Sequence, residues 1–264
     1  MTPILPLITS LTVQRLETVE AAAARRMVEL TPGATGLDAM GGYAAMMGAG
    51  SPLTHVLGAG VTGAVAEEEL ARLEEFNAAH GADTVLELCP VVDGTLLELM
   101  QARGYRVVQF ENLLVANLTV APAEPTAAAI RRVRDDEHVS WARLMAQAFF
   151  SREEVTEEEA AIGVPFARMG GAYVAEADGL AVATGAMWVH DETAFLMTDG
   201  TLPGFRGRGL QQALIQRRLI DAMAAGARFA MASTLVNSGS QANYLRHGFR
   251  VLYTKFTALR PLAR

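Results

Sequence analysis

Residues 198–214 read TDGTLPGFRGRGLQQAL, so the end of an expected strand leads through a turn rich in Gly and Arg into a helix-forming run. The N-terminus of a helix presents unpaired backbone N–H groups and the positive end of the helix dipole, and therefore binds anions. Gly207 and Gly209 let the backbone approach a phosphate without a Cβ atom in the way, and Arg206 and Arg208 add planar, charged donors. The first helical turn carries no acidic residue. We therefore expect a pyrophosphate site at this loop.

Strands and helices alternate on both sides of the loop in the second half of the chain. Strands are expected at residues 130–133, 172–177, 180–189, 193–198, 229–235 and 249–259, where β-forming residues run between turn signals. Helices are expected at residues 136–150, 153–161, 209–225 and 240–247. Asp178-Gly179 suits a hairpin turn. Antiparallel strands followed by a β-α-β-α-β run predict the α/β class, with a mixed central sheet and helices on both faces.

Two motifs in this half resemble those of the GCN5-related N-acetyltransferase (GNAT) superfamily. Residues 206–211, RGRGLQ, look like its acyl-CoA-binding motif Arg/Gln-x-x-Gly-x-Gly/Ala. Residues 237–249, NSGSQANYLRHGF, look like the region after its fifth strand, Asn-x-x-(Ser/Ala)-x-x-x-Tyr-x-x-x-Gly-Phe. The motifs occur in the expected order, and their separation fits one helix plus one strand. The resemblance covers roughly the whole second half.

The resemblance implies an N-acetyltransferase that moves an acetyl or other acyl group from acetyl-CoA to an amine of a small molecule or peptide. A cytoplasmic location is expected separately, because a single cysteine is typical of a reducing compartment. The amine would attack the thioester directly in a ternary complex, and a backbone N–H of the splayed fourth strand would hold the oxyanion. Asn237 would contact the pantetheine arm. Tyr244 would protonate the departing thiolate, because a phenol with a pKa of about 10 keeps its proton at neutral pH. The residues that the resemblance assigns to the co-substrate are Leu196, Met197, Thr198, Arg206, Gly207, Arg208, Gly209, Leu210, Gln211, Asn237 and Tyr244.

One residue departs from the acyl-CoA motif, and the general base stays unassigned. Gln211 stands where the family usually has a small residue. An acyl-CoA-binding regulatory protein without turnover therefore remains an alternative function. Glu176, His190 and Asp199 lie on or after the expected central strands and could reach the amine, directly or through water.

The first half repeats the pattern of the second. Gly104-Tyr105 before an apolar run matches Gly248-Phe249, and a Gly-Ala turn before a strand occurs at Gly81 and again at Gly226. An internal repeat of a whole domain explains these matches. The Pro-containing stretch at residues 121–129 predicts a linker between a domain at residues 1–120 and a catalytic domain at residues 130–264. In the repeat, Met100 corresponds to Tyr244 of the second half. The first domain is therefore expected to be a degenerate copy that lacks the tyrosine acid.

Gly58, Gly60 and Gly63 match the dinucleotide fingerprint Gly-x-Gly-x-x-Gly between an expected strand and a helix at residues 67–79. Because of this motif, an NAD(P)-dependent oxidoreductase remains a second alternative function. Residues 67–69 are all Glu, however, and would repel a pyrophosphate at the start of that helix. The expected domain is also too short for a complete doubly wound fold.

Charge and residue content argue against nucleic-acid, membrane and metal partners. The 264 residues carry a formal net charge of −7, which argues against a nucleic-acid surface. The N-terminal apolar run at residues 4–8 is too short for a membrane span and lacks a basic flank, so no signal peptide or membrane partner is expected. The five histidines show no ligand spacing and Cys89 is the only cysteine, so no metal site is predicted. The sequence leaves open whether the protein forms a homodimer.

Overall fold

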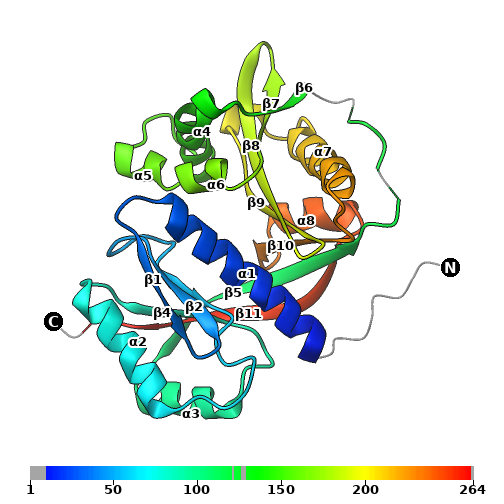
Figure 1. Cartoon of the computed structure of the whole chain (residues 1–264). Helices are drawn as coiled ribbons and strands as arrows, with labels where there is room; N and C mark the ends of the chain where they lie inside the picture. The colour runs from blue at the N-terminus through cyan, green and yellow to red at the C-terminus, as the bar shows by residue number, and fades with distance from the viewer. Residues whose placement is uncertain (1–9, 121, 126–128, 263–264) are drawn as a thin grey trace. The chain divides into compact units, whose positions relative to one another are not determined.

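The computed structural model describes residues 10–120, 122–125 and 129–262, which form a series of helices and strands (Figure 1). The first half contains α1 (Ser10–Leu30), β1 (Thr35–Ala39), β2 (Gly42–Met46), β3 (His55–Leu57), α2 (Glu67–Ala79), β4 (Thr84–Leu88), α3 (Gly94–Ala102) and β5 (Arg106–Asn117). The second half contains β6 (Ala129–Arg132), α4 (His138–Phe150), α5 (Glu157–Ala161), α6 (Val164–Arg168), β7 (Ala172–Ala177), β8 (Leu180–His190), β9 (Thr193–Thr201), α7 (Leu210–Ala224), β10 (Phe229–Leu235), α8 (Gly239–Arg246) and β11 (Arg250–Arg260). The predicted mixed α/β class is confirmed.

The chain divides into two compact units that differ from the two halves of the sequence. The first unit contains the described parts of Met1–Asn112 and Leu252–Arg264, and the second contains Leu113–Val251. Strand β5 therefore begins in the first unit and ends in the second, and most of β11 belongs to the first unit although it closes the second half of the sequence. Of the expected linker, residues 121 and 126–128 lie outside the described residues, and residues 122–125 form neither helix nor strand.

Each unit contains a mixed sheet with the same change of direction. In the first unit the strand order is β1-β2-β3-β4-β11-β5, with β2 and β3 antiparallel, β3 and β4 parallel, and β11 antiparallel to β4. In the second unit the order is β5-β10-β9-β8-β7-β6, with β8 and β9 antiparallel and β9 and β10 parallel. Two connected antiparallel strands therefore lead into a parallel strand in both units.

Helices cover both faces of the sheet in the second unit. Tyr173 and Ala175 of β7 belong to the core that includes the apolar face of α7, whereas Ala172 and Val174 belong to the core beneath α4. Successive side chains of a strand point to opposite faces, so this alternation places α4 and α7 on opposite sides of the sheet. The layered arrangement predicted for the second half is confirmed.

The predicted repeat is visible in the backbone hydrogen bonds of the two units. The N–H of Tyr105 donates to the carbonyl of Met100 at 3.0 Å, and the N–H of Phe249 donates to the carbonyl of Tyr244 at 3.3 Å. In each case the intervening glycine, Gly104 or Gly248, has a positive φ, which a residue with a Cβ atom rarely adopts. Met100 thus occupies in the first unit the place that Tyr244 occupies in the second.

Two expected elements of the second unit differ from the structure by three or more residues at one end. The acidic helix begins at Glu157 rather than at residue 153, because Thr156 is its N-cap and accepts a hydrogen bond from the N–H of Glu159 at 3.1 Å. Strand β9 runs on to Thr201, although Asp199-Gly200 looks like a turn in the sequence. The helix α6 was not predicted.

A cluster of buried charges lies in the core of the first unit. The ammonium of Lys255 is fully buried and contacts the carboxylates of Glu17 at 3.3 Å and Glu87 at 3.0 Å, as well as that of Glu20. The hydroxyl of Tyr253 donates to Glu17 at 2.8 Å. Burial, opposed by the charge of Lys255, raises the pKa of Glu20 to about 8. One cation thus contacts three carboxyl groups, and burial favours the protonated form of Glu20.

Because the pKa of Glu20 is raised on folding, the folded protein binds more protons than the unfolded chain between about pH 4.5 and about pH 8. The free energy of unfolding is therefore expected to fall as the pH rises through this window. Glu20→Gln removes the titrating group and should flatten the dependence, whereas Glu29→Gln, at an exposed residue of the same helix, should leave it unchanged. Urea unfolding at a series of pH values measures both slopes. An equally steep slope in Glu20→Gln would show that another group is responsible.

Candidate active site

A groove of about 770 Å³ opens beside the N-terminus of α7 in the second unit. Its volume lies within the range of small-molecule sites. Its walls come from the C-terminal end of α4, the end of β9, the loop before α7, and α8. The lining residues are Ala148, Phe149, Asp199, Gly200, Thr201, Phe205, Arg206, Gly207, Gly209, Leu210, Gln211, Gln212, Gly239, Ser240, Ala242, Asn243 and Arg246.

The loop before α7 presents backbone donors to this groove. Gly207 and Gly209 have φ values of 76° and 77°, in the left-handed region that favours glycine. Helix α7 begins at Leu210 with no acidic residue in its first turn. Within the described residues, no backbone hydrogen bond from the N–H groups of residues 207–212 is found. These groups and the helix dipole make the rim of the groove suited to an anion.

The two arginines of the loop have different surroundings. Arg206 lines the groove and donates to the carbonyl oxygens of Thr201 at 3.0 Å and Ala148 at 3.2 Å and to the hydroxyl of Ser151 at 2.7 Å. It therefore ties the loop to the C-terminal end of α4. Arg208 is not a lining residue: its guanidinium contacts Asp178 at 3.3 Å and stacks on the ring of Phe205.

Gln211 lines the groove and leaves one donor unused. Its Oε1 accepts from the hydroxyl of Thr201 at 3.3 Å, which fixes the side chain. Its Nε2 is buried and has no hydrogen-bond partner among the described residues. A buried donor without a partner is costly, and an oxygen of a bound anion would satisfy it. The residue that departs from the family motif is thus compatible with an anionic ligand.

Strands β9 and β10 separate next to the groove. They pair over only three residues, from Thr193↔Phe229 to Phe195↔Met231. Leu196, Met197 and Thr198, which the resemblance assigns to the co-substrate, follow this separation on β9. None of the three is a lining residue, and the side chains of Leu196 and Met197 are buried in the sheet.

A β-bulge interrupts β9 at the groove. Met197 pairs with Ala186 and Gly200 with Thr184, so Thr198 and Asp199 lie opposite the single residue Gly185. Thr198 has a φ of 56°. A bulge re-aims side chains and leaves backbone groups unpaired. Here it allows Asp199, rather than the three residues before it, to reach the groove.

Asn237 lies just before α8, and Tyr244 lies within it. Asn237 precedes α8 with a φ of 58°, is exposed, and donates through its backbone N–H to Oε1 of Gln241 at 2.8 Å, but it does not line the groove. Tyr244 is only 2 % exposed and packs edge-on against Phe249. Its hydroxyl donates to Oδ2 of Asp199. Burial, reinforced by the charge of Asp199, raises the pKa of Tyr244 well above its ordinary value.

The sequence reasoning missed Arg218, which completes a buried polar network with Asp199 and Tyr244. Arg218 comes from α7, is fully buried, and donates to Oδ1 of Asp199. It follows Leu214 by four residues and therefore lies on the apolar face of the helix. A cation at an apolar position of an amphipathic helix is the signal that could have identified it, because a buried charge needs a partner.

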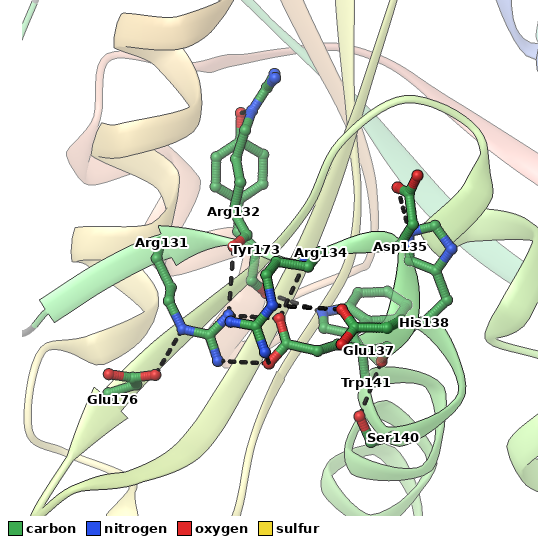
Figure 2. A network of polar contacts seen from close by, with 11 residues as sticks. Arg131, Arg132, Arg134, Asp135, Glu137, His138, Ser140, Trp141, Tyr173 and Glu176 are labelled. Carbon is green, nitrogen blue, oxygen red and sulfur yellow. Dashed lines mark hydrogen bonds and ion pairs between the residues drawn. The ribbon is translucent and has the colours of Figure 1, made fainter.

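Of the three candidate bases, only Asp199 lines the groove. Figure 2 shows Glu176 on β7 directed to Arg131 of β6. Nε of Arg131 donates to Glu176 at 2.7 Å, and Arg131 also donates to Glu137. His190 stacks on Trp188, and its Nε2 lies 3.6 Å from Asp191. The structure therefore brings Asp199 and Tyr244 together with the loop before α7 and keeps Glu176 and His190 in other contacts.

The corresponding loop of the first unit has two backbone donors occupied just before α2. The N–H of Val65 donates to the hydroxyl of Thr95 at 2.8 Å, and the N–H of Ala66 donates to the carboxylate of Glu69 at 3.1 Å. Three glutamates follow at the start of α2. Both the used donors and the acidic turn disfavour a pyrophosphate at the Gly58 loop, which weakens the oxidoreductase alternative.

Two features are absent from the described residues. No group of three or more His, Cys, Asp or Glu side chains there is placed to hold a metal ion. None of the helices in that part of the chain combines the length and apolar character needed to cross a bilayer.

Comparisons with known proteins agree with this geometry. The acetyltransferase (GNAT) family model matches residues 131–249. A GCN5-related N-acetyltransferase from Kribbella flavida is similar in structure, with a TM-score of 0.69 and 20% identity over 94% of this chain and 95% of that chain. A tandem GNAT protein from the clavulanic acid biosynthesis pathway has a TM-score of 0.56 and 13% identity over 75% and 70% of the two chains. No curated protein matches the sequence.

The two structural likenesses support the fold, and the second one has a tandem arrangement, as predicted for this chain. The family model covers the loop before α7, the bulge in β9 and helix α8, which together form the groove. Residues 131–249 therefore match the acetyltransferase (GNAT) family, and the structural likenesses support the same fold.

Proposed function

We propose that the protein is an acetyltransferase that moves the acetyl group of acetyl-CoA to an amine of a small molecule or peptide. The observation that carries the proposal is the groove, in which the free N–H groups before α7 lie at one end and the carboxylate of Asp199 lies on a wall. The first feature suits the phosphates of the co-substrate, and the second suits an amine or its ammonium form.

Three features of the loop before α7 support binding of an acyl-CoA in this groove. Gly207 has open space where a Cβ atom would stand, so a phosphate can approach its backbone. Nε2 of Gln211 adds a side-chain donor beside the first turn of α7. Arg206 holds the loop against α4. Leu196, Met197, Thr198 and Asn237 would lie along the pantetheine arm, by the resemblance of their motifs.

Direct attack of the amine on the thioester is the simplest reaction for this groove. No cysteine is among the lining residues, and Cys89 is buried in the first unit, where burial raises the pKa of its thiol to about 11. A covalent acyl-cysteine therefore has no candidate there. Asp199 and Tyr244 are the groups at hand for proton transfer.

Thiol release measured with acetyl-CoA and a panel of amines tests the proposed function. Release is expected with at least one amine, and blanks without acetyl-CoA correct for Cys89. Calorimetric titrations with acetyl-CoA and with NAD separate the alternatives. Binding of acetyl-CoA without turnover of any amine would favour the regulatory alternative. Tight binding of NAD without binding of CoA would favour an oxidoreductase and contradict the proposal.

A further inference from the structure

We propose that Asp199 carries the proton from the attacking amine to the departing sulfur, and that Arg218 and Tyr244 are positioning residues that hold it for this task. The inference rests on the proposed function. It gives the proton to a different residue from the one that the family resemblance implies, because Asp199 lines the groove, whereas the buried Tyr244 does not and its hydroxyl donates to Asp199.

The hydrogen bonds of Arg218 fix the bulge as well as the carboxylate. Its Nη1 donates to the carbonyl oxygens of Ala186 at 2.9 Å and Met197 at 3.3 Å, the two residues that pair immediately before the bulge. Its Nε donates to the carbonyl of Leu214 at 3.1 Å, within α7. Its Nη2 donates to Asp199. One guanidinium thus joins α7, β8 and β9 at the point where Asp199 leaves the regular ladder.

The absence of a side chain at residue 185 makes this arrangement possible. A Cβ atom on Gly185 would lie 2.7 Å from Cζ of Arg218, closer than real Cβ contacts allow. Gly185 is the residue opposite the bulge. The guanidinium therefore occupies the space above this glycine, and its position depends on a residue that does not touch the groove.

Asp199 keeps acceptor capacity for a ligand. Oδ1 accepts from Arg218 and Oδ2 accepts from Tyr244, so each oxygen has one strong donor. A carboxylate has about four acceptor positions, which leaves room for the N–H of an amine. The side chain is 8 % exposed, on the side where the residue lines the groove. Two fixed donors hold the carboxylate in one orientation, as proton transfer requires.

The proton balance closes within the groove. The acceptor enters as a neutral amine after its ammonium form has lost one proton to water. Its nitrogen forms a bond to the thioester carbon, and Asp199 takes a proton from that nitrogen. The carbon–sulfur bond breaks with its electron pair on sulfur, and Asp199 returns the proton to the sulfur. An amide and a free thiol result, and Asp199 is again a carboxylate.

Three variants test the assignment, with kcat and the acetyl-CoA Kd measured separately. Asp199→Asn should lower kcat about 100-fold and leave the Kd within about threefold, because the lost step is proton transfer. Gly185→Ala should displace Arg218 and lower kcat about tenfold, and Tyr244→Phe should do the same by removing one donor to Asp199. The matched controls are Asp136→Asn, at an exposed residue, and Gly94→Ala, where a Cβ atom meets open space.

Chemical rescue separates a proton carrier from a structural residue. Formate should restore at least a tenth of the lost activity to Asp199→Ala in a saturable manner, which a purely structural role would not allow. An active wild type whose Asp199→Asn variant keeps its kcat would overturn the assignment. A larger loss in Tyr244→Phe than in Asp199→Asn would return the proton to the tyrosine. A wild type that binds acetyl-CoA but acetylates no amine would instead contradict the proposed function.

Discussion

Replacing Gln211 and Gln212 together by glutamate is expected to weaken acetyl-CoA binding about 100-fold, because each new carboxylate beside the phosphates costs about 1.4 kcal/mol. Both residues line the groove in the first turn of α7. The double variant reproduces on α7 the acidic first turn that α2 has in the first unit. Acidic residues at a helix N-terminus favour the helix itself, so the fold should be retained. Calorimetric titration with acetyl-CoA measures the loss.

The control for this double variant is Gln216→Glu, which lies more than a helical turn further along α7 and outside the groove. Its affinity should remain close to that of the wild type. Raising the salt concentration should shrink the effect of the double variant, because salt screens the repulsion between exposed charges. An unchanged affinity in the double variant would mean that the phosphates of acetyl-CoA bind elsewhere.

Lys255→Met is expected to lower the free energy of unfolding by about 3–5 kcal/mol, the usual cost of removing one partner from a buried ion pair. The substitution keeps an apolar side chain of similar length but leaves Glu17, Glu20 and Glu87 without their cation. Because protonation of the carboxyl groups relieves the repulsion, the deficit should shrink as the pH is lowered. Urea unfolding at neutral and at mildly acidic pH gives both quantities.

Arg260→Met is the matched control for Lys255→Met. Arg260 lies on the same strand β11, is 40% exposed, and contacts Glu74 at 2.8 Å. A half-exposed ion pair contributes little, so the expected loss is below about 1 kcal/mol. Equal losses of unfolding free energy in the two variants would show that the buried cluster contributes no more to stability than an exposed ion pair.

Local patterns were sufficient to predict the elements around the groove. The Gly- and Arg-rich turn predicted the start of α7, which begins at Leu210, and the repeated Gly-aromatic turns predicted that α3 and α8 end alike. These features depend on residues adjacent in sequence, such as the glycines with positive φ at the helix ends. For the same reason Gly207 and Gly209 could be placed at a helix N-terminus without any knowledge of the tertiary structure.

The parts that sequence reasoning did not give depend on residues far apart in the chain. Strand β11 pairs with β4, from Phe256↔Leu88 to Arg260↔Thr84, and no local pattern identifies a partner so distant in sequence. The Asp199-Gly200 pair resembles a turn, but β9 passes through it as a bulge because Arg218 supplies the missing hydrogen bonds. Tyr244 was recognised from its motif, whereas its bond to Asp199 required both α8 and β9 in place.

The buried position of Lys255 has a chemical consequence if, as proposed, the protein uses acetyl-CoA. Lys255 is the only lysine in the 264 residues, and its ammonium is fully enclosed by carboxylates. Thioesters acylate accessible lysine amines without any enzyme, and the folded domain offers them no lysine target. Modification of Lys255, detected by peptide mass spectrometry, would therefore record moments when the core of the first unit opens. The residue is a built-in reporter of local unfolding.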